Sequence, residues 1–216
     1  MDTLISASLL GCDLSLILHE LQDVQDSGVD WIHYDVMDGM FVKNISFGEP
    51  LLKGIKKHIH IPIDTHLMIV DPIRYIDNYA DLGADGITFH YEATDDPQAV
   101  IDKIHSRGLK AGLAIRPQTP VEKIRKFLPD LELLLVMTVN PGYGGQKFLP
   151  ETLEKVSQAR FLIDGLDKDI RLQVDGGINE ETCKICRDAG ADVLVSGSYL
   201  FSAENKKKAL EILRNF

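Results

Sequence analysis

The chain has 216 residues, of which 44% are hydrophobic and 26% charged, a composition typical of a globular protein with one domain over residues 1–216. Its 23 basic and 33 acidic residues give a formal net charge of −10, which excludes nucleic acid and anionic membrane as expected partners. A phosphorylated substrate stays possible, because backbone N–H groups hold phosphate without lysine. No stretch approaches the roughly 20 apolar residues of a membrane span, and three cysteines in a chain of this size favour a reducing compartment, so we expect a cytoplasmic protein.

Short β-rich runs alternate with amphipathic helical segments along the whole chain. The helical segments carry apolar residues three and four positions apart, and the first of them reads Leu14, Leu18, Leu21 and Val24. The predicted strands cover residues 4–9, 31–36, 61–67, 86–90, 110–115, 133–138, 170–174 and 193–196.

A short repeated pattern precedes several of these strands. Gly28, Gly83 and Gly190 each stand two residues before an aspartate that leads into a strand, and each glycine is a candidate helix C-cap. Eight such β-then-α units in about 200–250 residues predict a closed parallel (β/α)8 TIM barrel. The alternative is an open doubly wound sheet, but the glycine-rich dinucleotide fingerprint is missing after the first strand.

Polar side chains stand near the ends of three predicted strands, where active sites of such barrels gather. Side chains alternate between the two faces of a strand, so residues two positions apart point the same way. Two imidazoles and two carboxylates at these ends suit one divalent ion such as Zn, Fe, Mn or Co, whereas Ca prefers oxygen ligands. Hydrogen bonding among inward polar groups without a metal is the alternative. The groups that share a face are His33, Asp35 and Met37, then Asp64, His66 and Met68, with Asp175 on the seventh strand.

Glycine-rich loops follow the sixth, seventh and eighth predicted strands. The loop at 140–146 reads N-P-G-Y-G-G-Q, residues 176–177 are both glycine, and residues 196–198 read S-G-S. Glycines allow the backbone to approach an anion closely, and the last loops of these barrels commonly bind phosphate. Ordinary turn glycines are the alternative for any one loop, but the three together favour a phosphate cradle.

Several segments together resemble one family, in order and over nearly the whole chain. They are S-A-S-L-L at 6–10, H-Y-D-V-M-D-G at 33–39, D-T-H-L-M at 64–68, V-N-P-G-Y-G-G-Q-K-F at 139–148, V-D-G-G at 174–177 and V-S-G-S at 195–198. These segments resemble the motifs of the ribulose-phosphate 3-epimerase family. The resemblance implies a barrel of the ribulose-phosphate-binding type, a small-molecule sugar phosphate as the binding partner, and a homo-oligomer.

The same resemblance implies a reaction and a role for each matching residue. The reaction is epimerisation at C3 of a ketose phosphate, D-ribulose 5-phosphate to D-xylulose 5-phosphate, through a metal-stabilised enediolate. Asp35 and Asp175 would be the acid–base pair, on opposite faces of the substrate. The implied metal ligands are His33, Asp35, His66 and Asp175; the sugar contacts are Ser8 and His66; the phosphate contacts are Gly142, Tyr143, Gly144, Gly145, Gly176, Gly177, Gly197 and Ser198; and the methionines lining the centre are Met37, Met68 and Met137.

The chain departs from the family pattern at three positions. Met40 and Lys43 stand where histidine and proline are usual, and Ala7 stands where proline is usual. None is a ligand or an acid–base position, but the first two lie in the loop after the second strand, where substrate shape could be read. Another ketose phosphate, such as D-allulose 6-phosphate, is therefore an alternative substrate.

Two further alternatives concern the reaction itself. Decarboxylases on related barrels carry a D-x-K-x-x-D arrangement, and Met37 stands where that lysine would be. A non-catalytic phosphosugar-binding barrel would bind its ligand without turnover. The complete set of acid, base and ligands favours an enzyme.

Overall fold

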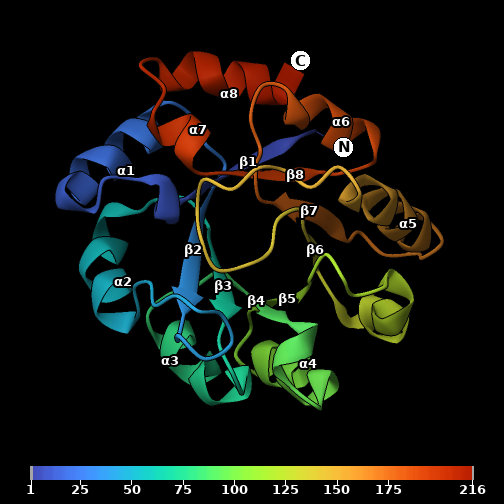
Figure 1. Cartoon of the computed structure of the whole chain (residues 1–216). Coiled ribbons are helices and arrows are strands. Elements are labelled where there is room, and N and C mark those ends of the chain that lie inside the picture. Colours follow the sequence, from blue (N-terminus) through green and yellow to red (C-terminus); the bar gives the residue numbers. More distant parts are fainter. Residues whose placement is uncertain (1, 216) are drawn as a thin grey trace.

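The computed structural model describes residues 2–215, and within them eight parallel strands close into a barrel in chain order (Figure 1). The predicted TIM barrel is thereby confirmed. None of the helices in this part of the chain is both long and apolar enough to cross a bilayer. The strands are β1 Leu4–Ser8, β2 Trp31–Met37, β3 Ile63–Met68, β4 Gly86–His90, β5 Lys110–Ile115, β6 Leu133–Met137, β7 Arg171–Asp175 and β8 Val193–Ser196.

The predicted strand positions agree with these bounds to within one or two residues, and β4, β5 and β8 agree at both ends. The largest difference is at β3, which begins at Ile63 rather than at residue 61. Pro62 has no N–H to donate to a ladder, and the N–H of Ile63 donates to the Asp85 carboxylate at 2.9 Å. At the other end, β7 extends through Asp175, so this carboxyl group is mounted on a strand rather than on a loop.

Helices form the outer layer around the barrel (Figure 1). The predicted apolar face of the first helix is wrong at its N-terminal end. A 3-10 turn, Leu14–Leu16, precedes α1, and Leu14 and Leu18 are about half exposed, whereas Leu21 and Val24 are buried. The helices are α1 Ile17–Asp26, α2 Glu49–Ile55, α3 Ile76–Asp81, α4 Pro97–Ser106, α5 Thr152–Asp164, α6 Thr182–Asp188, α7 Ser198–Phe201 and α8 Lys206–Asn215, with the 3-10 segment Val121–Asp130 after β5.

The repeated glycine-to-aspartate pattern lies at the amino-terminal ends of the barrel strands. The three glycines have positive φ, at 89°, 86° and 105°, as a turn at a helix C-terminus requires. The aspartate two residues later accepts a backbone N–H from the first or second residue of a neighbouring strand, a donor that would otherwise be buried without a partner. The pairs are Asp30 with Ile5, Asp85 with Ile63 and Asp192 with Leu172.

The register of β2 and β3 brings the polar residues together at the opposite end. Asp35 pairs with His66, and Met37 pairs with Met68. On the far side of the barrel, Met137 pairs with Asp175. Because the strands are parallel, their carboxyl ends meet at one rim, and the inward side chains of three strands converge there.

Candidate active site

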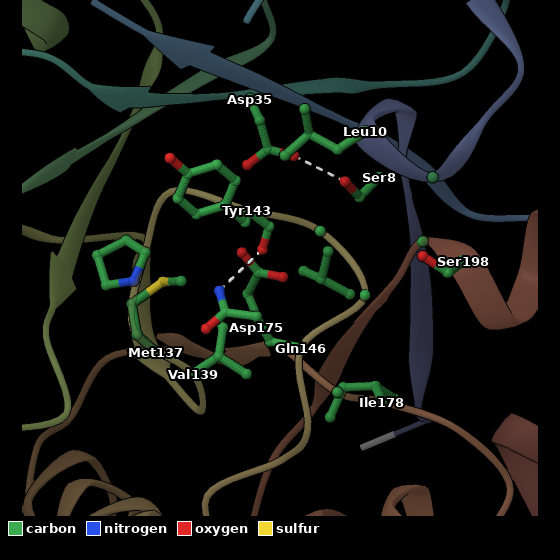
Figure 2. Close-up of a pocket in the computed structure, with 18 of the residues that line it drawn as sticks. Ser8, Leu10, Asp35, Met137, Val139, Tyr143, Gln146, Asp175, Ile178 and Ser198 are labelled. Atoms are coloured by element: carbon green, nitrogen blue, oxygen red, sulfur yellow. Dashed lines mark hydrogen bonds between the residues drawn. The ribbon is translucent and has the colours of Figure 1, made fainter. Parts of the chain in front are cut away.

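A cavity of about 210 Å³ opens at the carboxyl ends of the strands. This is a volume for a small metabolite rather than for a large cofactor. Figure 2 shows Asp35 and Asp175 reaching toward this space from separate strands, with the loop of Tyr143 crossing beside them. Asp35 and Asp175 are the charged side chains among the described residues that line the cavity.

The structure gathers nearly all of the predicted site residues at this cavity. Ser8, the three methionines, the two aspartates and the glycine loops line it, whereas His33 and His66 lie behind the wall and are fully buried. Several further lining residues were given no individual role from the sequence, although Pro141 and Gln146 lie in the predicted phosphate-binding loop. They are Leu10, Gly11, Val139, Pro141, Gln146, Ile178, Asn179, Val195 and Tyr199.

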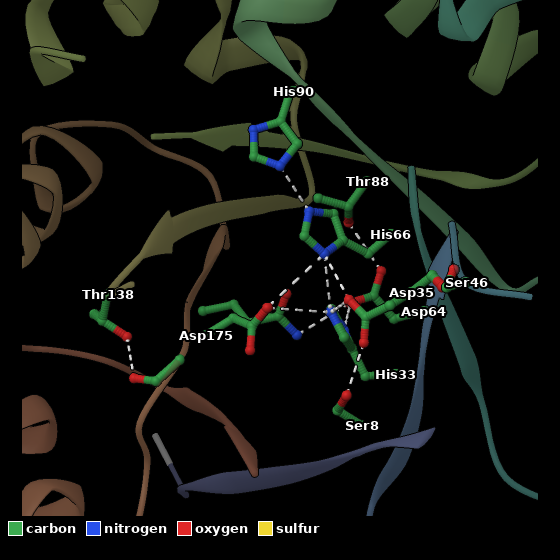
Figure 3. A network of polar contacts seen from close by, with 12 residues as sticks. Ser8, His33, Asp35, Ser46, Asp64, His66, Thr88, His90, Thr138 and Asp175 are labelled. Atoms are coloured by element: carbon green, nitrogen blue, oxygen red, sulfur yellow. Dashed lines mark hydrogen bonds and ion pairs between the residues drawn. The ribbon is translucent and has the colours of Figure 1, made fainter. Parts of the chain in front are cut away.

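The two buried imidazoles behind the cavity wall converge with the two carboxylates that line it (Figure 3). Nε2 of His33 lies 3.2 Å from Nδ1 of His66. Oδ1 of Asp35 lies 3.2 Å from the first of these nitrogens and 3.0 Å from the second. Oδ2 of Asp175 lies 3.7 and 3.9 Å from the same two atoms. One donor atom from each of the four residues therefore lies within 4.8 Å of the others.

This donor set fits a divalent metal ion. Ligands about 2.0–2.1 Å from a tetrahedral ion lie about 3.3 Å from one another, close to the 3.0–3.9 Å separations that involve the two histidines. The charge balance agrees. Burial lowers the pKa of His33, but Asp35 and Asp64 raise it well above its usual value, so a proton supplies the positive charge that this cluster requires. A bound cation would supply the same charge without that proton.

The two aspartates of the cluster have opposite acid–base properties. Burial raises the pKa of Asp35, but the charges and hydrogen bonds of His33 and His66 outweigh burial and hold it below the usual range. Burial, followed by the negative charge of Asp35, raises the pKa of Asp175 to about 6, since the histidines lie farther from this carboxylate. Ser8 donates its hydroxyl hydrogen to Oδ2 of Asp35 at 2.7 Å.

A second layer of polar residues supports the cluster, and sequence reasoning missed its roles. Asp64 contacts His33, and His90 contacts His66 (Figure 3). Burial lowers the pKa of His90 to about 4, so its ring is neutral at neutral pH. A histidine at the end of a predicted strand was the available signal, because it shares the inward face with Thr88.

The glycine loops bring backbone against backbone at the cavity rim. A Cβ on Gly177, which has φ +68°, would lie 2.5 Å from the backbone nitrogen of Phe148, and one on Gly11 would lie 2.3 Å from the carbonyl carbon of Gly197. Backbone N–H groups gathered around one space can bind an anion. The lining residues whose N–H groups donate no hydrogen bond to other residues in the 2–215 range include Gly144, Gly145, Gly177 and Ser198.

In the loop after β2, Met40 and Lys43 form hydrogen bonds through their backbone rather than through their side chains. The carboxylate of Asp38 accepts the N–H groups of Met40 and Phe41. The Met40 side chain is 77% exposed. Lys43 contributes a carbonyl oxygen, which accepts the Tyr143 hydroxyl at 2.9 Å. Neither departure from the family pattern in this loop contributes to the cavity lining.

Solved structures of low sequence identity share this fold. KGPDC from Streptococcus mutans has a TM-score of 0.75 at 16% identity, with 100% of this chain and 97% of that chain covered. The 3-hexulose-6-phosphate synthase of Salmonella typhimurium has a TM-score of 0.72 at 20% identity, with 99% and 97% covered.

Sequence relatives are much closer. The ribulose-phosphate 3-epimerase of Mycobacterium tuberculosis is 42% identical over 211 residues, covering 98% of this chain and 91% of the relative. The enzyme of the same name from Bacillus subtilis is 41% identical, covering 97% of both chains. The profile of the ribulose-phosphate 3 epimerase family matches residues 4–201. The chain therefore belongs to the ribulose-phosphate 3-epimerase family and is an isomerase.

Proposed function

We propose that the protein interconverts D-ribulose 5-phosphate and D-xylulose 5-phosphate, with Asp35 and Asp175 as the acid–base pair. Epimerisation at C3 removes a proton from the carbon next to a carbonyl group and returns a proton from the other face. It therefore needs one carboxylate and one carboxylic acid in the same cavity. The opposite pKa shifts of these two aspartates are the observation that carries the proposal.

Each aspartate has one oxygen directed at the histidines and one left for proton transfer. Oδ1 of Asp35 and Oδ2 of Asp175 face His33 and His66. The other oxygen of Asp35, held by the Ser8 hydroxyl, takes the C3 proton as the C–H bond breaks. Asp175 then gives its own proton to C3 from the opposite face, and the new C–H bond forms. In the reverse direction the two carboxyl groups exchange roles.

A divalent ion would be held by His33, Asp35, His66 and Asp175. When bound, the ion supplies positive charge that lowers the energy of the enediolate. Zn, Fe, Mn and Co all accept this mixture of imidazole and carboxylate ligands.

The rest of the cavity suits the two ends of the substrate. Met37, Met68 and Met137 are almost fully buried and form an apolar wall, which keeps water from the carbanionic carbon. The phosphate would be bound by backbone N–H groups, because no lysine or arginine belongs to the described lining of this cavity. Gly145 and Gly177 are central to that cradle. A homo-oligomer remains a prediction.

The alternative substrate, D-allulose 6-phosphate, loses its main support. It was suggested by Met40 and Lys43, and neither residue lines the cavity. A barrel that binds phosphosugars without turnover would have no use for an acid–base pair with separated pKa values.

The test is epimerisation of D-ribulose 5-phosphate in deuterated water by Zn-loaded and by chelated protein. We expect D-xylulose 5-phosphate with deuterium at C3 from the loaded protein and little product after chelation. Asp175→Asn should lower turnover by about 10²- to 10⁴-fold, while Asp167→Asn, which removes an exposed carboxyl group, should not. A folded, Zn-loaded protein that gives neither product nor exchange would refute the pentulose as substrate.

A further inference from the structure

The two histidines of the cluster each use only one ring nitrogen toward the other ligands. The far nitrogen of His33, Nδ1, lies 3.0 Å from Oδ2 of Asp64. The far nitrogen of His66, Nε2, lies 2.9 Å from Nε2 of His90, whose Nδ1 lies 3.3 Å from Oε2 of Glu92. The three imidazoles are fully buried, so water does not compete for these contacts.

We propose that Asp64 and the His90–Glu92 pair are positioning residues that fix the tautomers of the two histidine ligands. Each histidine is linked to a carboxylate, His33 directly and His66 through a second imidazole. Together these contacts leave Nε2 of His33 and Nδ1 of His66 without a hydrogen, so that each has a lone pair available for a divalent ion. The inference rests on the proposed metal site and adds the residues that prepare it.

For His33, the argument follows from the character of its partner. An ionised carboxylate only accepts hydrogen bonds, so Nδ1 of His33 must be the donor. Asp64 is itself held in place, since its Oδ1 accepts the Thr88 hydroxyl at 2.8 Å and its Oδ2 accepts Nε2–H of Gln173 at 3.1 Å. A neutral His33 ring with its hydrogen on Nδ1 has its lone pair on Nε2, where the other ligands converge.

For His66, the same reasoning applies through a second imidazole, that of His90. The carboxylate of Glu92 accepts the backbone N–H of Arg116 at 2.9 Å and the Thr119 hydroxyl. It also accepts Nδ1–H of His90. A neutral His90 that donates from Nδ1 has a lone pair on Nε2. That lone pair can only accept from Nε2–H of His66, which leaves Nδ1 of His66 free to bind a metal.

The packing of Phe41 explains why His90 stays in this orientation. The Phe41 ring lies 4.9 Å from the His90 ring, and the guanidinium of Arg116 lies 4.0 Å from the Phe41 ring. Arg116 also donates to the Phe41 carbonyl at 2.9 Å. The loop after β2 therefore packs on the His90 ring, and a rotated His90 would lose both its aromatic neighbour and its carboxylate.

The direct test is nitrogen-detected NMR of the Zn-loaded protein with ¹⁵N-labelled histidine. The imidazole signals are assigned with variants in which one histidine at a time is replaced. We expect the hydrogen of His33 on Nδ1 and the hydrogen of His66 on Nε2. The opposite tautomer of either ring in a protein that binds Zn²⁺ would overturn the inference and leave the proposed metal site standing. A parent protein that binds no Zn²⁺ would overturn both.

Variants provide a second readout, the dissociation constant for Zn²⁺ measured by competition with a chromophoric chelator. Asp64→Ala and His90→Phe should each weaken binding by about 10- to 100-fold. Thr65→Val is the matched control, because Thr65 lies beside Asp64 on β3 and its buried hydroxyl has no partner among the described residues. Folded variants that bind Zn²⁺ as tightly as this control would refute the positioning role. If a variant does not fold, the tautomers of the parent protein decide.

Discussion

Replacing Asp175 by asparagine should stabilise the metal-free protein at neutral pH. The environment of Asp175 raises its pKa from 3.8 to about 6. Because the pKa of Asp175 is higher in the folded than in the unfolded protein, the protonated side chain favours folding below about pH 4. This contribution to stability is lost as the pH rises to about 6. At about 1.4 kcal/mol for each pH unit, the ionised carboxylate costs the folded protein about 3 kcal/mol at pH 7.5. Asparagine does not ionise and avoids this cost.

The assay is thermal unfolding of parent and Asp175→Asn in excess chelator at pH 4 and pH 7.5. About 3 kcal/mol corresponds to a Tm higher by roughly 6–12 °C for the variant at pH 7.5, with the difference shrinking toward pH 4. Asp167→Asn, at an exposed position, should show no comparable pH-dependent difference. A Tm difference between Asp175→Asn and the parent that is the same at both pH values would refute the electrostatic reasoning.

Adding Zn²⁺ should stabilise the parent more than the variant and so reduce the Tm difference between them. At 1,000 times its dissociation constant, a ligand stabilises the folded parent by about 4 kcal/mol. Asp175→Asn lacks one proposed ligand and should gain less. A variant that gains as much stability from Zn²⁺ as the parent would show that Asp175 does not bind the ion.

Three further variants test separate parts of the site. Gly177→Ala should lower Tm and raise KM, because a positive φ costs alanine about 1–2 kcal/mol and the added Cβ would meet the backbone of Phe148. Gly144→Ala is the control and should keep the parent Tm, because the atom nearest to its added Cβ lies 3.7 Å away. Ser8→Ala should lower kcat by about 10- to 100-fold, since it removes a hydrogen bond to an ionised carboxylate, and unchanged turnover would contradict that role. Met40→His combined with Lys43→Pro should change kcat/KM for D-ribulose 5-phosphate by no more than about twofold, and a larger change would place the β2 loop in substrate recognition.

Much of the site was predictable because it depends on local periodicity and on a symmetric fold. Alternation along a strand is enough to place His33 and Asp35 on one face. A closed parallel barrel then brings the ends of all its strands to one rim, so that Asp175 joins them although it lies 140 positions after Asp35 in the chain. The glycines at turns were predictable for the same reason, since positive φ is a local property.

The residues that escaped prediction depend on contacts between segments. His90 reaches His66 only because β3 and β4 pair with His66 opposite Thr88, and no pattern within β4 states that register. The error at α1 has a related cause. Apolar spacing continues through a 3-10 turn without interruption, so Leu14 and Leu18 looked like part of a buried face that begins farther along the helix.

The opposite pKa shifts of Asp35 and Asp175 also arise from packing. The two side chains have the same intrinsic pKa, and both lie near the carboxyl ends of strands and line one cavity. Asp35 is enclosed between two imidazoles at 3.0–3.2 Å and remains ionised. Asp175 stands farther from the same rings, and its side chain is 17% exposed, so its pKa is raised to about 6 and it can exchange a proton with solvent. A difference of less than 1 Å in distance to the histidines thus accompanies the opposite pKa shifts of the two aspartates, and only the folded chain sets that distance.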